Sequence, residues 1–421
     1  RHDWEPIRAI HDDRFKHVAT MYTEKPGYRL DPDEDCDILA RFEGGFHHVV
    51  ILRVYEEETE GVYVIKVPAI GTRARWQKSN METMDAEIEI IQHLHRHTNI
   101  PVPENIASDS SFDGELGVPY IMMRRLPGVP SNKLWFEDNE KRNHITADDI
   151  LEETEKKRVN MLQSLAKVMS ELQSFSFDKI GRPDFINTYS GGEFDFTNPD
   201  LEQTYPYGPF TSSTAYMTTQ LDALWPLSPP TEGLHYFDRL IRIGVRKVLD
   251  IIYAHPAISH SVATPSSTES FVLRHPDLDF QNILVDADGN VTGLLDWDGC
   301  TTVPRCAGYA SLPSFLTQDW EAKYDPTESP YMSWQLDRYR AVYAQAMEET
   351  GCPEAKYTAK SAMYCAVMDV AQLGGGGDAQ DLVKKLLVEC GNFRRWGSVE
   401  RVLMMLGKGW PRAEEFMKGE I

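Results

Sequence analysis

A short segment in the second half of the chain carries three polar residues at spacings that suit phosphoryl transfer. It reads HPDLDFQNILVDADGNVTGLLDWDG and runs from His275 to Gly299. Asp277 can orient an attacking hydroxyl group and accept its proton. Asn282 and Asp296 offer the oxygen ligands that Mg²⁺ prefers when it bridges nucleotide phosphates. The segment therefore predicts a catalytic carboxylate beside a metal site.

Strand signals around this segment explain how its two ends could meet. The apolar runs Ile283–Val285 and Val291–Leu295 flank the turn sequence DADG, which predicts a hairpin. This hairpin would fold Asp296 back beside Asn282. A further short strand is expected at Phe271–Leu273, just before the loop that carries Asp277.

The front third of the chain has a different pattern, rich in strands. Residues 36–67 contain the runs CDILARF, HHVVILRVY and VYVIKVP separated by turns, which predicts a three-stranded antiparallel meander. Apolar residues then recur at helical spacing from Met84 to Leu94, and Val118–Met123 is a strand candidate. Helical patterns dominate the rest, at residues 159–172, 237–253 and from Ser333 onward. The expected fold class is α+β, with a small β-rich part and a larger helical part.

In this order, the motifs resemble those of the aminoglycoside phosphotransferase and choline kinase-like families. FDKIG at 177–181 and GPFTS at 208–212 resemble marks of the branch common in filamentous fungi. These families share the protein kinase fold, so the resemblance implies two lobes. The N-lobe would comprise residues 1–125 and the mostly helical C-lobe residues 126–421. The C-lobe would carry a catalytic loop at 275–282 and a metal segment at 296–298. Beyond Leu316 the chain matches these families only as a helical region.

The resemblance also implies a nucleotide site. Gly44 and Gly45 are expected in the loop that covers the nucleotide. Lys66, in the strand VYVIKVP, would bind the phosphates with Glu87 as its helix partner. The hinge PYIMMRRLPG would contribute Met123, Arg124 and Leu126. ATP and Mg²⁺ are the implied cofactors. GTP stays open, because Arg124 and Arg125 stand where these families often have Glu and an aromatic residue.

Several residues near the motif allow more than one interpretation. In kinase-like folds the histidine that matches His275 mainly makes structural hydrogen bonds, and we expect that role here. Asp279 could face substrate or metal, or point outward as a loop carboxylate. Asp298 could support or bind a metal ion, or cap the following segment. The acidic and aromatic residues at 319–321, 325, 328 and 348–349 could bind an ammonium group or form a solvated acidic face.

Composition limits the classes of partner. The chain has 421 residues with 43 Lys+Arg and 65 Asp+Glu, and its net charge of −22 disfavours nucleic acids and anionic membranes. The six scattered cysteines form no CxxC pair, which favours reduced thiols and a cytoplasmic location. The sequence contains no run of 18 apolar residues, so we expect no transmembrane helix. The first residues, RHDWEPIR, do not resemble a signal peptide. We expect a monomer, with oligomers left open.

These observations favour an ATP- and Mg²⁺-dependent kinase that phosphorylates a hydroxyl group of a small molecule, which could be cationic like an aminoglycoside or choline. Two alternatives belong to other classes. A kinase-like scaffold could bind nucleotide without catalysis, although the full set of motif residues argues against it. A protein kinase is least favoured, because Pro276 stands where the Arg before the catalytic Asp is expected, and no Ala-Pro-Glu segment follows Asp298.

Overall fold

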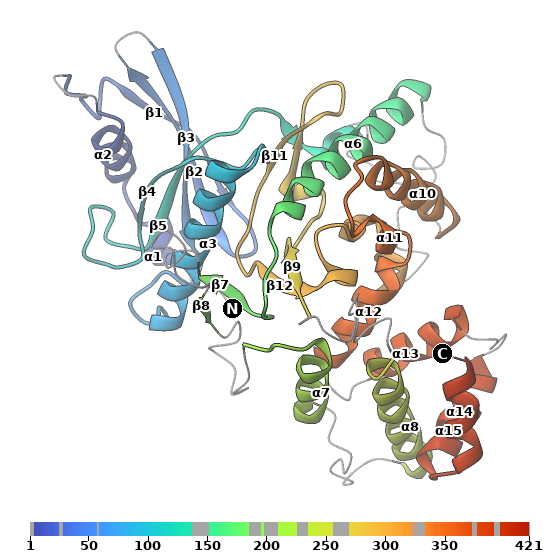
Figure 1. Ribbon diagram of the computed structural model, residues 1–421. Helices are drawn as coiled ribbons and strands as arrows, with labels where there is room; N and C mark the ends of the chain where they lie inside the picture. The colour runs from blue at the N-terminus through green and yellow to red at the C-terminus, as the bar shows by residue number, and fades with distance from the viewer. Residues whose placement is uncertain are drawn as a thin grey trace.

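The structure is a computed structural model in which a strand-rich part and a larger helical part lie side by side (Figure 1). The residues it describes are 4–24, 28–56, 59–136, 151–184, 195–197, 209–224, 235–255, 269–321, 324, 333–372, 377–390 and 396–420. The predicted α+β class is confirmed: a small part built on an antiparallel sheet precedes a larger, mostly helical part. The division of the two lobes at residues 125 and 126 stays a prediction.

The N-terminal part is built on a five-stranded antiparallel sheet with the order β1-β2-β3-β5-β4. Its strands are β1 (Cys36–Glu43), β2 (His47–Glu56), β3 (Thr59–Pro68), β4 (Asn105–Asp109) and β5 (Tyr120–Arg124). The predicted meander is therefore confirmed as β1 to β3, and the strand expected at 118–123 is confirmed as β5. The polar strand β4 was not predicted from the sequence.

Helices cover both faces of this sheet. Two N-terminal helices, α1 (Glu5–Arg8) and α2 (Asp12–Thr23), pack on one face, where Tyr120 and Met122 of β5 are buried. Helix α3 (Lys78–His97) packs on the other, against Ile121 and Met123 of the same strand. Successive side chains of a strand point to opposite faces, so β5 supplies both cores.

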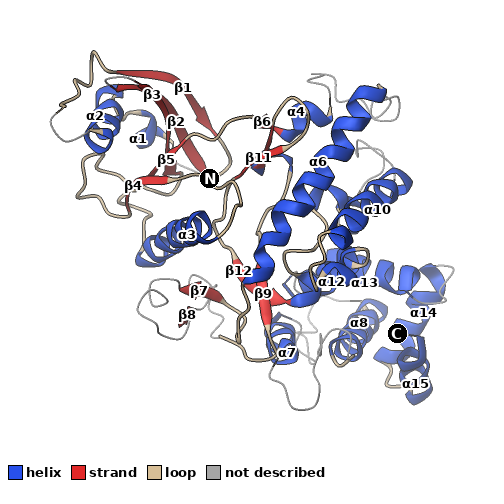
Figure 2. Ribbon diagram, turned by 45° about the horizontal axis from the view of Figure 1, so that its top comes forward, coloured by secondary structure: helices blue, strands red, loops and turns tan. Residues whose placement is uncertain are grey.

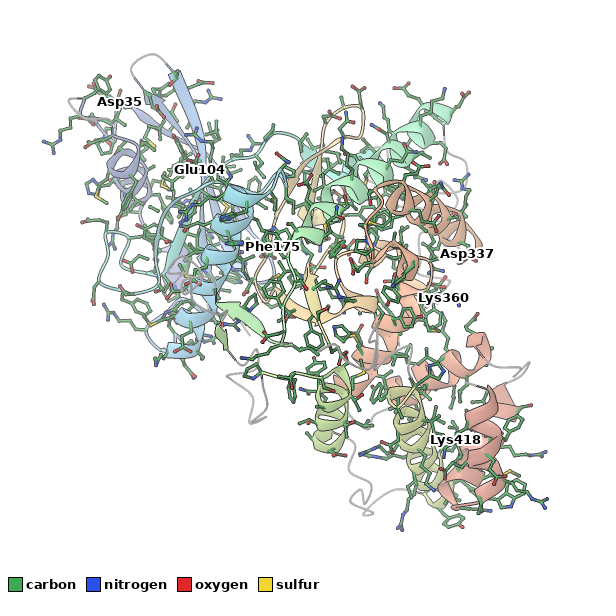
Figure 3. The ribbon with its side chains drawn as sticks, in the orientation of Figure 1. Asp35, Glu104, Phe175, Asp337, Lys360 and Lys418 are labelled. Atoms are coloured by element: carbon green, nitrogen blue, oxygen red, sulfur yellow. The ribbon has the colours of Figure 1, made fainter. Side chains whose placement is uncertain are left out.

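Helix α3 belongs to both parts of the molecule. Its first half contacts the sheet, while Ile90, Ile91 and Leu94 in its second half join the main core of the helical part. The His93 ring lies 5.2 Å from the ring of Phe175, which is at the junction between the two parts (Figure 3). Any shift of α3 therefore moves groups in both lobes.

The helical part also contains short strands that carry the motif segment. Its helices are α4 (Ser131–Trp135), α6 (Glu152–Ser170), α7 (Ser213–Leu224), α8 (Tyr236–Tyr253), α10 (Ser333–Glu349), α11 (Ala355–Thr358), α12 (Ser361–Gln372), α13 (Gly377–Cys390), α14 (Trp396–Gly407) and α15 (Pro411–Glu420). Its strands are β6 (Val129–Pro130), β7 (Arg182–Asp184), β8 (Asp195–Thr197), β9 (Phe271–Arg274), β10 (Ile283–Val285), β11 (Val291–Leu294) and β12 (Thr301–Pro304).

The predicted hairpin is confirmed as β10 and β11, which pair antiparallel, and β6 adds to the other edge of β10. Strand β9 pairs with β12. Figure 2 shows α6 running alongside α10, and the α8, α13, α14 and α15 helices gathered at the far end of the molecule. Among the described residues, every helix is too short or too polar to span a lipid bilayer.

Helices α8 and α14 approach each other at two glycines. A Cβ atom on Gly244 would lie 2.0 Å from the Leu403 carbonyl oxygen, and one on Gly407 would lie 2.0 Å from the Leu240 carbonyl oxygen. Both obstacles are backbone atoms of the facing helix, so they cannot move aside as a flexible side chain could. The close crossing therefore requires glycine at both positions.

We expect Gly244→Ala to lower the unfolding free energy by about 1–3 kcal/mol or more, because overpacking outweighs the gain in helix propensity. Urea unfolding of the purified protein measures this change. The matched control is Gly419→Ala in α15, where a Cβ atom would meet nothing within 4 Å. In this control only the gain in helix propensity should change the stability. Equal unfolding midpoints for the two variants would contradict the expected steric clash at Gly244.

Candidate active site

The loop after β9 is held in place by His275. The backbone N–H of Asp277 donates to Nδ1 of His275 (3.1 Å), so Nε2 carries the ring proton and donates to the Leu295 carbonyl (3.0 Å). Burial lowers the pKa of His275 to about 4, which keeps the ring neutral. The ring also packs edge-on against the buried Trp297 at 4.5 Å. These contacts agree with the structural role expected for His275.

The carboxylate of Asp277 is exposed, and one of its oxygens is fixed by two amide groups. Oδ2 accepts from Nδ2 of Asn282 (2.9 Å) and from Nε2 of Gln281 (3.0 Å). Within the described residues, Oδ1 of Asp277 has no hydrogen-bond partner. The carboxylate is thus oriented through one oxygen while the other is open to a ligand. Gln281 was not predicted to contribute.

Asp296 lies directly after β11 in a conformation that few non-glycine residues adopt. Its φ of 63° is the only positive value among the described non-glycine residues. Asp tolerates this left-handed region better than most residues, and such outliers gather at functional sites. The turn aims the carboxylate across to the other lobe, where its Oδ1 lies 2.7 Å from Nζ of Lys66. The hairpin closes behind it through the bond from Leu295 N to the Asn282 carbonyl (2.9 Å).

Lys66 joins two carboxylates from distant parts of the chain. Its Nζ lies 2.9 Å from Oε1 of Glu87 on α3, in addition to the contact with Asp296. The side chain of Lys66 is 12% exposed and that of Glu87 is 4% exposed. Burial alone would lower the pKa of Lys66, but the two carboxylates outweigh it and the pKa is raised. The pKa of Asp296 is lowered, because Lys66 outweighs the effect of burial. Burial raises the pKa of Glu87, with Lys66 acting in the opposite direction. Lys66 and Asp296 are therefore charged at neutral pH.

The oxygen atoms of Asn282 and Asp296 fit a magnesium ion. Asn282 uses its Nδ2 to donate to both the carbonyl and the carboxylate of Asp277, which leaves its Oδ1 without a hydrogen bond in the described structure. Oδ2 of Asp296 is likewise not engaged there. No group of three or more His, Cys, Asp or Glu side chains among the described residues could hold a metal. Such a two-residue set suits Mg²⁺, which completes its shell with phosphates and water.

A cavity of about 140 Å³ opens beside Lys66 and Glu87. Phe46, in the loop between β1 and β2, and His47, the first residue of β2, form part of its wall, and Asp298 faces it from the opposite lobe. The space beside Gly44 and Gly45 in this loop is open, since a Cβ atom would meet nothing closer than 3.8 Å. Burial, with Lys66 beside it, lowers the pKa of His47 to about 3. His47 is a cavity residue that we did not predict from the sequence.

The predicted hinge connects β5 to β6, and only part of it can reach a ligand through its backbone. The N–H of Arg124 donates to the Glu104 carbonyl (2.9 Å), and Met123 is buried within the sheet. In the described residues, no hydrogen bond involves the N–H of Leu126. A Cβ atom on Gly293 would lie 2.9 Å from Cδ1 of both Leu126 and Leu284, so these side chains converge beside the hinge. Leu284 was not among the predicted residues.

A larger cavity of about 310 Å³ lies on the other side of the catalytic loop. Pro276 and Leu278, the neighbours of Asp277, line it together with Trp320, Glu321 and Asp369. Glu321 makes no ion pair within the described part of the chain. Its pKa is raised, mainly by burial and also by the negative charge of Asp279. Asp369 lies 3.9 Å from Arg274, a loose contact. Two carboxylates thus face this cavity without tight partners.

Among the described residues proposed for an ammonium site, Asp319 and Trp320 already contact basic side chains of the protein. Asp319 pairs with Arg340 and Lys385, and Nζ of Lys385 also lies 4.9 Å from the centre of the Trp320 ring. Glu348 and Glu349 do not line the cavity, while residues 325 and 328 lie outside the described residues. Of the described members of the predicted set, Glu321 is the carboxylate that lines this cavity without an ion pair.

Asp279 and Asp298 follow the site residues without joining the central contacts. Oδ1 of Asp279 accepts from the N–H of Phe280 (2.7 Å) and caps the short turn that leads to Asn282. This cap engages one oxygen of Asp279, and whether the carboxylate faces a ligand or points outward stays a prediction. Asp298 faces the cavity beside Lys66, so the role of supporting the metal site stays a prediction.

Comparison with known proteins gives a family match. The sequence model described as "Phosphotransferase enzyme family" matches residues 38–342 of the 421. Two curated relatives are subtelomeric hrmA-associated cluster proteins from two strains of Aspergillus fumigatus, each 22% identical over 341 residues. These alignments cover 67% of this chain and 61% of the relatives, so the chain spans about three fifths of their length.

Solved structures with a similar course of the chain share little sequence. The GDP complex of aminoglycoside 2'-phosphotransferase-IIIa has a TM-score of 0.43 at 14% identity and covers 94% of this chain and 98% of its own. Macrolide 2'-phosphotransferase type I has a TM-score of 0.43 at 12% identity, with 96% and 95% covered. Choline kinase from Cryptosporidium parvum Iowa II has a TM-score of 0.41 at 12% identity, with 94% of each chain covered.

Proposed function

The chain belongs to the phosphotransferase enzyme family, and on that basis we propose that it transfers the γ-phosphate of ATP to a hydroxyl group of a small molecule with Mg²⁺ as cofactor. The observation that carries this proposal is the convergence of two contacts, one of which crosses the lobes. Lys66 of β3 contacts Asp296 across the lobes, and Asn282, in the short turn just before β10, contacts Asp277 within the catalytic loop. A proton acceptor, a metal site and a phosphate-binding cation are therefore available in one place.

Each residue has a distinct part in this proposal. Oδ1 of Asp277 receives the proton of the acceptor hydroxyl group. The hydroxyl oxygen bonds to the γ-phosphorus as the bond between that phosphorus and the bridging β-phosphate oxygen breaks, which releases ADP. Asn282 and Asp296 would hold Mg²⁺, which when bound offsets the charge of the β- and γ-phosphates. Lys66 binds the phosphates and Glu87 keeps it in position. Most of the acceleration then comes from positioning and electrostatics.

On the nucleotide side, the adenine ring would lie against the hinge, where the N–H of Leu126 is available and Leu284 offers an apolar surface. Gly44 and Gly45 would let the loop between β1 and β2 approach the phosphates. Met123 shapes this region from inside the sheet, and Arg124 contributes backbone that is already bonded to Glu104.

For the acceptor, we assign the 310 Å³ cavity beside Pro276 and Leu278. Its free carboxylate at Glu321 favours an acceptor that carries an amine near its hydroxyl group. The apolar wall formed in part by Leu278 and Trp320 would suit a carbon skeleton of moderate size.

The test is a panel of hydroxyl compounds with ADP release as the readout, in which each amine-bearing compound stands beside its N-acetylated form. We expect turnover with amine-bearing compounds. Glu321→Gln should raise the KM for them about tenfold or more, since a hydrogen bond to a charged group contributes about 1.5–3 kcal/mol.

Glu349→Gln is the matched control, because Glu349 is on α10 and does not line the cavity. Equal turnover of amines and their N-acetylated forms would contradict the cationic acceptor and leave phosphotransfer standing. Failure of every hydroxyl compound to raise ADP release above the rate in buffer would contradict the proposed function.

A further inference from the structure

Residues 177–184 form a strap that contacts α3 as well as β9 and β12. The strap is bridged to β9 at Phe177 and Phe271, and to β12 at Gly181 and Thr302. Its end forms β7, which contacts both α3 and β12. Figures 1 and 2 both show β7 beside α3. The strap thus touches the helix that carries Glu87 and the strand that follows the metal segment.

The attachment to β12 is made by one buried side chain. Thr302 is completely buried, and its Oγ1 donates to the Lys179 carbonyl (2.7 Å) and accepts from the N–H of Gly181 (2.9 Å). The N–H of Thr302 donates in turn to the Gly181 carbonyl (2.8 Å). The backbone just before Arg182 is therefore fixed relative to residues 296–302.

Arg182 makes the attachment to α3. It is 6% exposed, and its Nη1 donates to Oγ1 of Thr83 (3.3 Å), one helical turn before Glu87. Burial of a guanidinium group needs compensation by nearby negative charge. Asp298, which lines the same cavity as Thr83, supplies negative charge on this side of α3.

The charges around the site explain why a second cation is useful here. Glu87, Asp296 and Asp298 are three carboxylates gathered around the single lysine Lys66. Arg182 adds a positive charge beside Thr83 of α3 without occupying the cavity, since it is not among the residues that line it. It can therefore stabilise the cluster and leave Lys66 free for phosphates.

We propose that Arg182 is a positioning residue that ties α3 to the segment 296–302, so that Glu87 and Asp296 stay together around Lys66. Because α3 has contacts in both lobes, loss of this tie would let Glu87 move away from Lys66 while the fold persists. The kinetic part of this inference rests on the proposed function. Its structural part does not, because the position of α3 can be followed in the ligand-free protein.

The experiment compares Arg182→Met with the wild type by hydrogen exchange and by kinetics. We expect faster amide exchange in residues 78–97 of the ligand-free protein. The KM for ATP and the Mg²⁺ concentration at half-maximal rate should rise about 10–100-fold, as is usual when a group that orients metal-site residues is lost. The KM of the acceptor should stay unchanged. Arg182→Lys should recover only part of the loss, because an ammonium group lacks the planar fork of arginine.

Thr83→Val provides a second variant in case Arg182→Met does not fold. It removes only the hydrogen-bond acceptor, and its effect on α3 exchange should not add to that of Arg182→Lys. The matched control is Arg246→Met, because Arg246 is 4% exposed and pairs with Asp222 and Asp250 far from the site. It should lower stability and leave α3 exchange and the KM for ATP unchanged.

Two outcomes would overturn the inference: α3 exchange in Arg182→Met that matches the Arg246→Met control, or additive effects of the variants at 83 and 182. A wild-type protein that turns over no acceptor would instead overturn the proposed function. In that case hydrogen exchange of α3 would still decide whether Arg182 holds the helix.

Discussion

Replacing Asp277 with asparagine should lower turnover by about 10²–10⁴-fold while ATP affinity stays near that of the wild type. The physical reason is that the substitution keeps the shape and the hydrogen bonds of the loop. The new amide can turn its oxygen toward Nδ2 of Asn282 and Nε2 of Gln281, which now donate to Oδ2. Its NH₂ group then faces the acceptor, where it can donate a hydrogen bond but cannot receive a proton.

ADP release and calorimetric titration of Mg·ATP measure the two parts of this result. Asp279→Asn is the matched control, because Asp279 is on the same loop and an amide oxygen can still accept from Phe280 N. We expect the control to retain most of the activity. An Asp277→Asn protein that turns over as fast as the control would rule out Asp277 as the base. A parallel loss of ATP affinity would mean that Asp277 shapes the nucleotide site instead.

Local spacing made the catalytic loop predictable. Asp277 and Asn282 are five residues apart, and the hairpin that returns Asp296 is signalled by two apolar runs around a turn. The contact between Lys66 and Asp296 joins residues 230 positions apart, so the spacing pattern gives no information about it. It was not predicted: the resemblance implied only that Lys66 pairs with Glu87, and the match to the phosphotransferase enzyme family confirms that resemblance.

Residues that act through tertiary contacts were missed for a common reason. Arg182 reaches Thr83 only because the strap is attached to β12, and no pattern along the chain signals such an attachment. The sequence analysis included Asp319 in a possible ammonium site for the same reason. Arg340 and Lys385 come from other helices to pair with it. Helix α2 is a different case, since Phe15, Val18 and Ala19 recur at helical spacing and the signal was available.

Replacing Asp296 with asparagine should remove the dependence of ATP binding on Mg²⁺ and lower turnover by about 10²–10³-fold or more. Asparagine is the right substitution because it accepts the left-handed conformation at φ 63°, whereas alanine would add backbone strain of about 1–3 kcal/mol. Thermal unfolding with ATP measures the effect, once with Mg²⁺ and once with excess EDTA. For the wild type, Mg²⁺ should add stability at saturating ATP by mass action.

The ATP affinity measured without Mg²⁺ distinguishes loss of the metal site from general damage to the nucleotide site. In the ligand-free protein Lys66 is shared between Glu87 and Asp296, so ATP phosphates must compete with Asp296 for Nζ of Lys66. Loss of the Asp296 charge removes that competitor and leaves the ion pair with Glu87. ATP affinity in EDTA should therefore stay equal or increase, while the increment from Mg²⁺ disappears. General damage to the site would instead lower both affinities. A variant that keeps the full Mg²⁺ increment would show that the metal is held elsewhere.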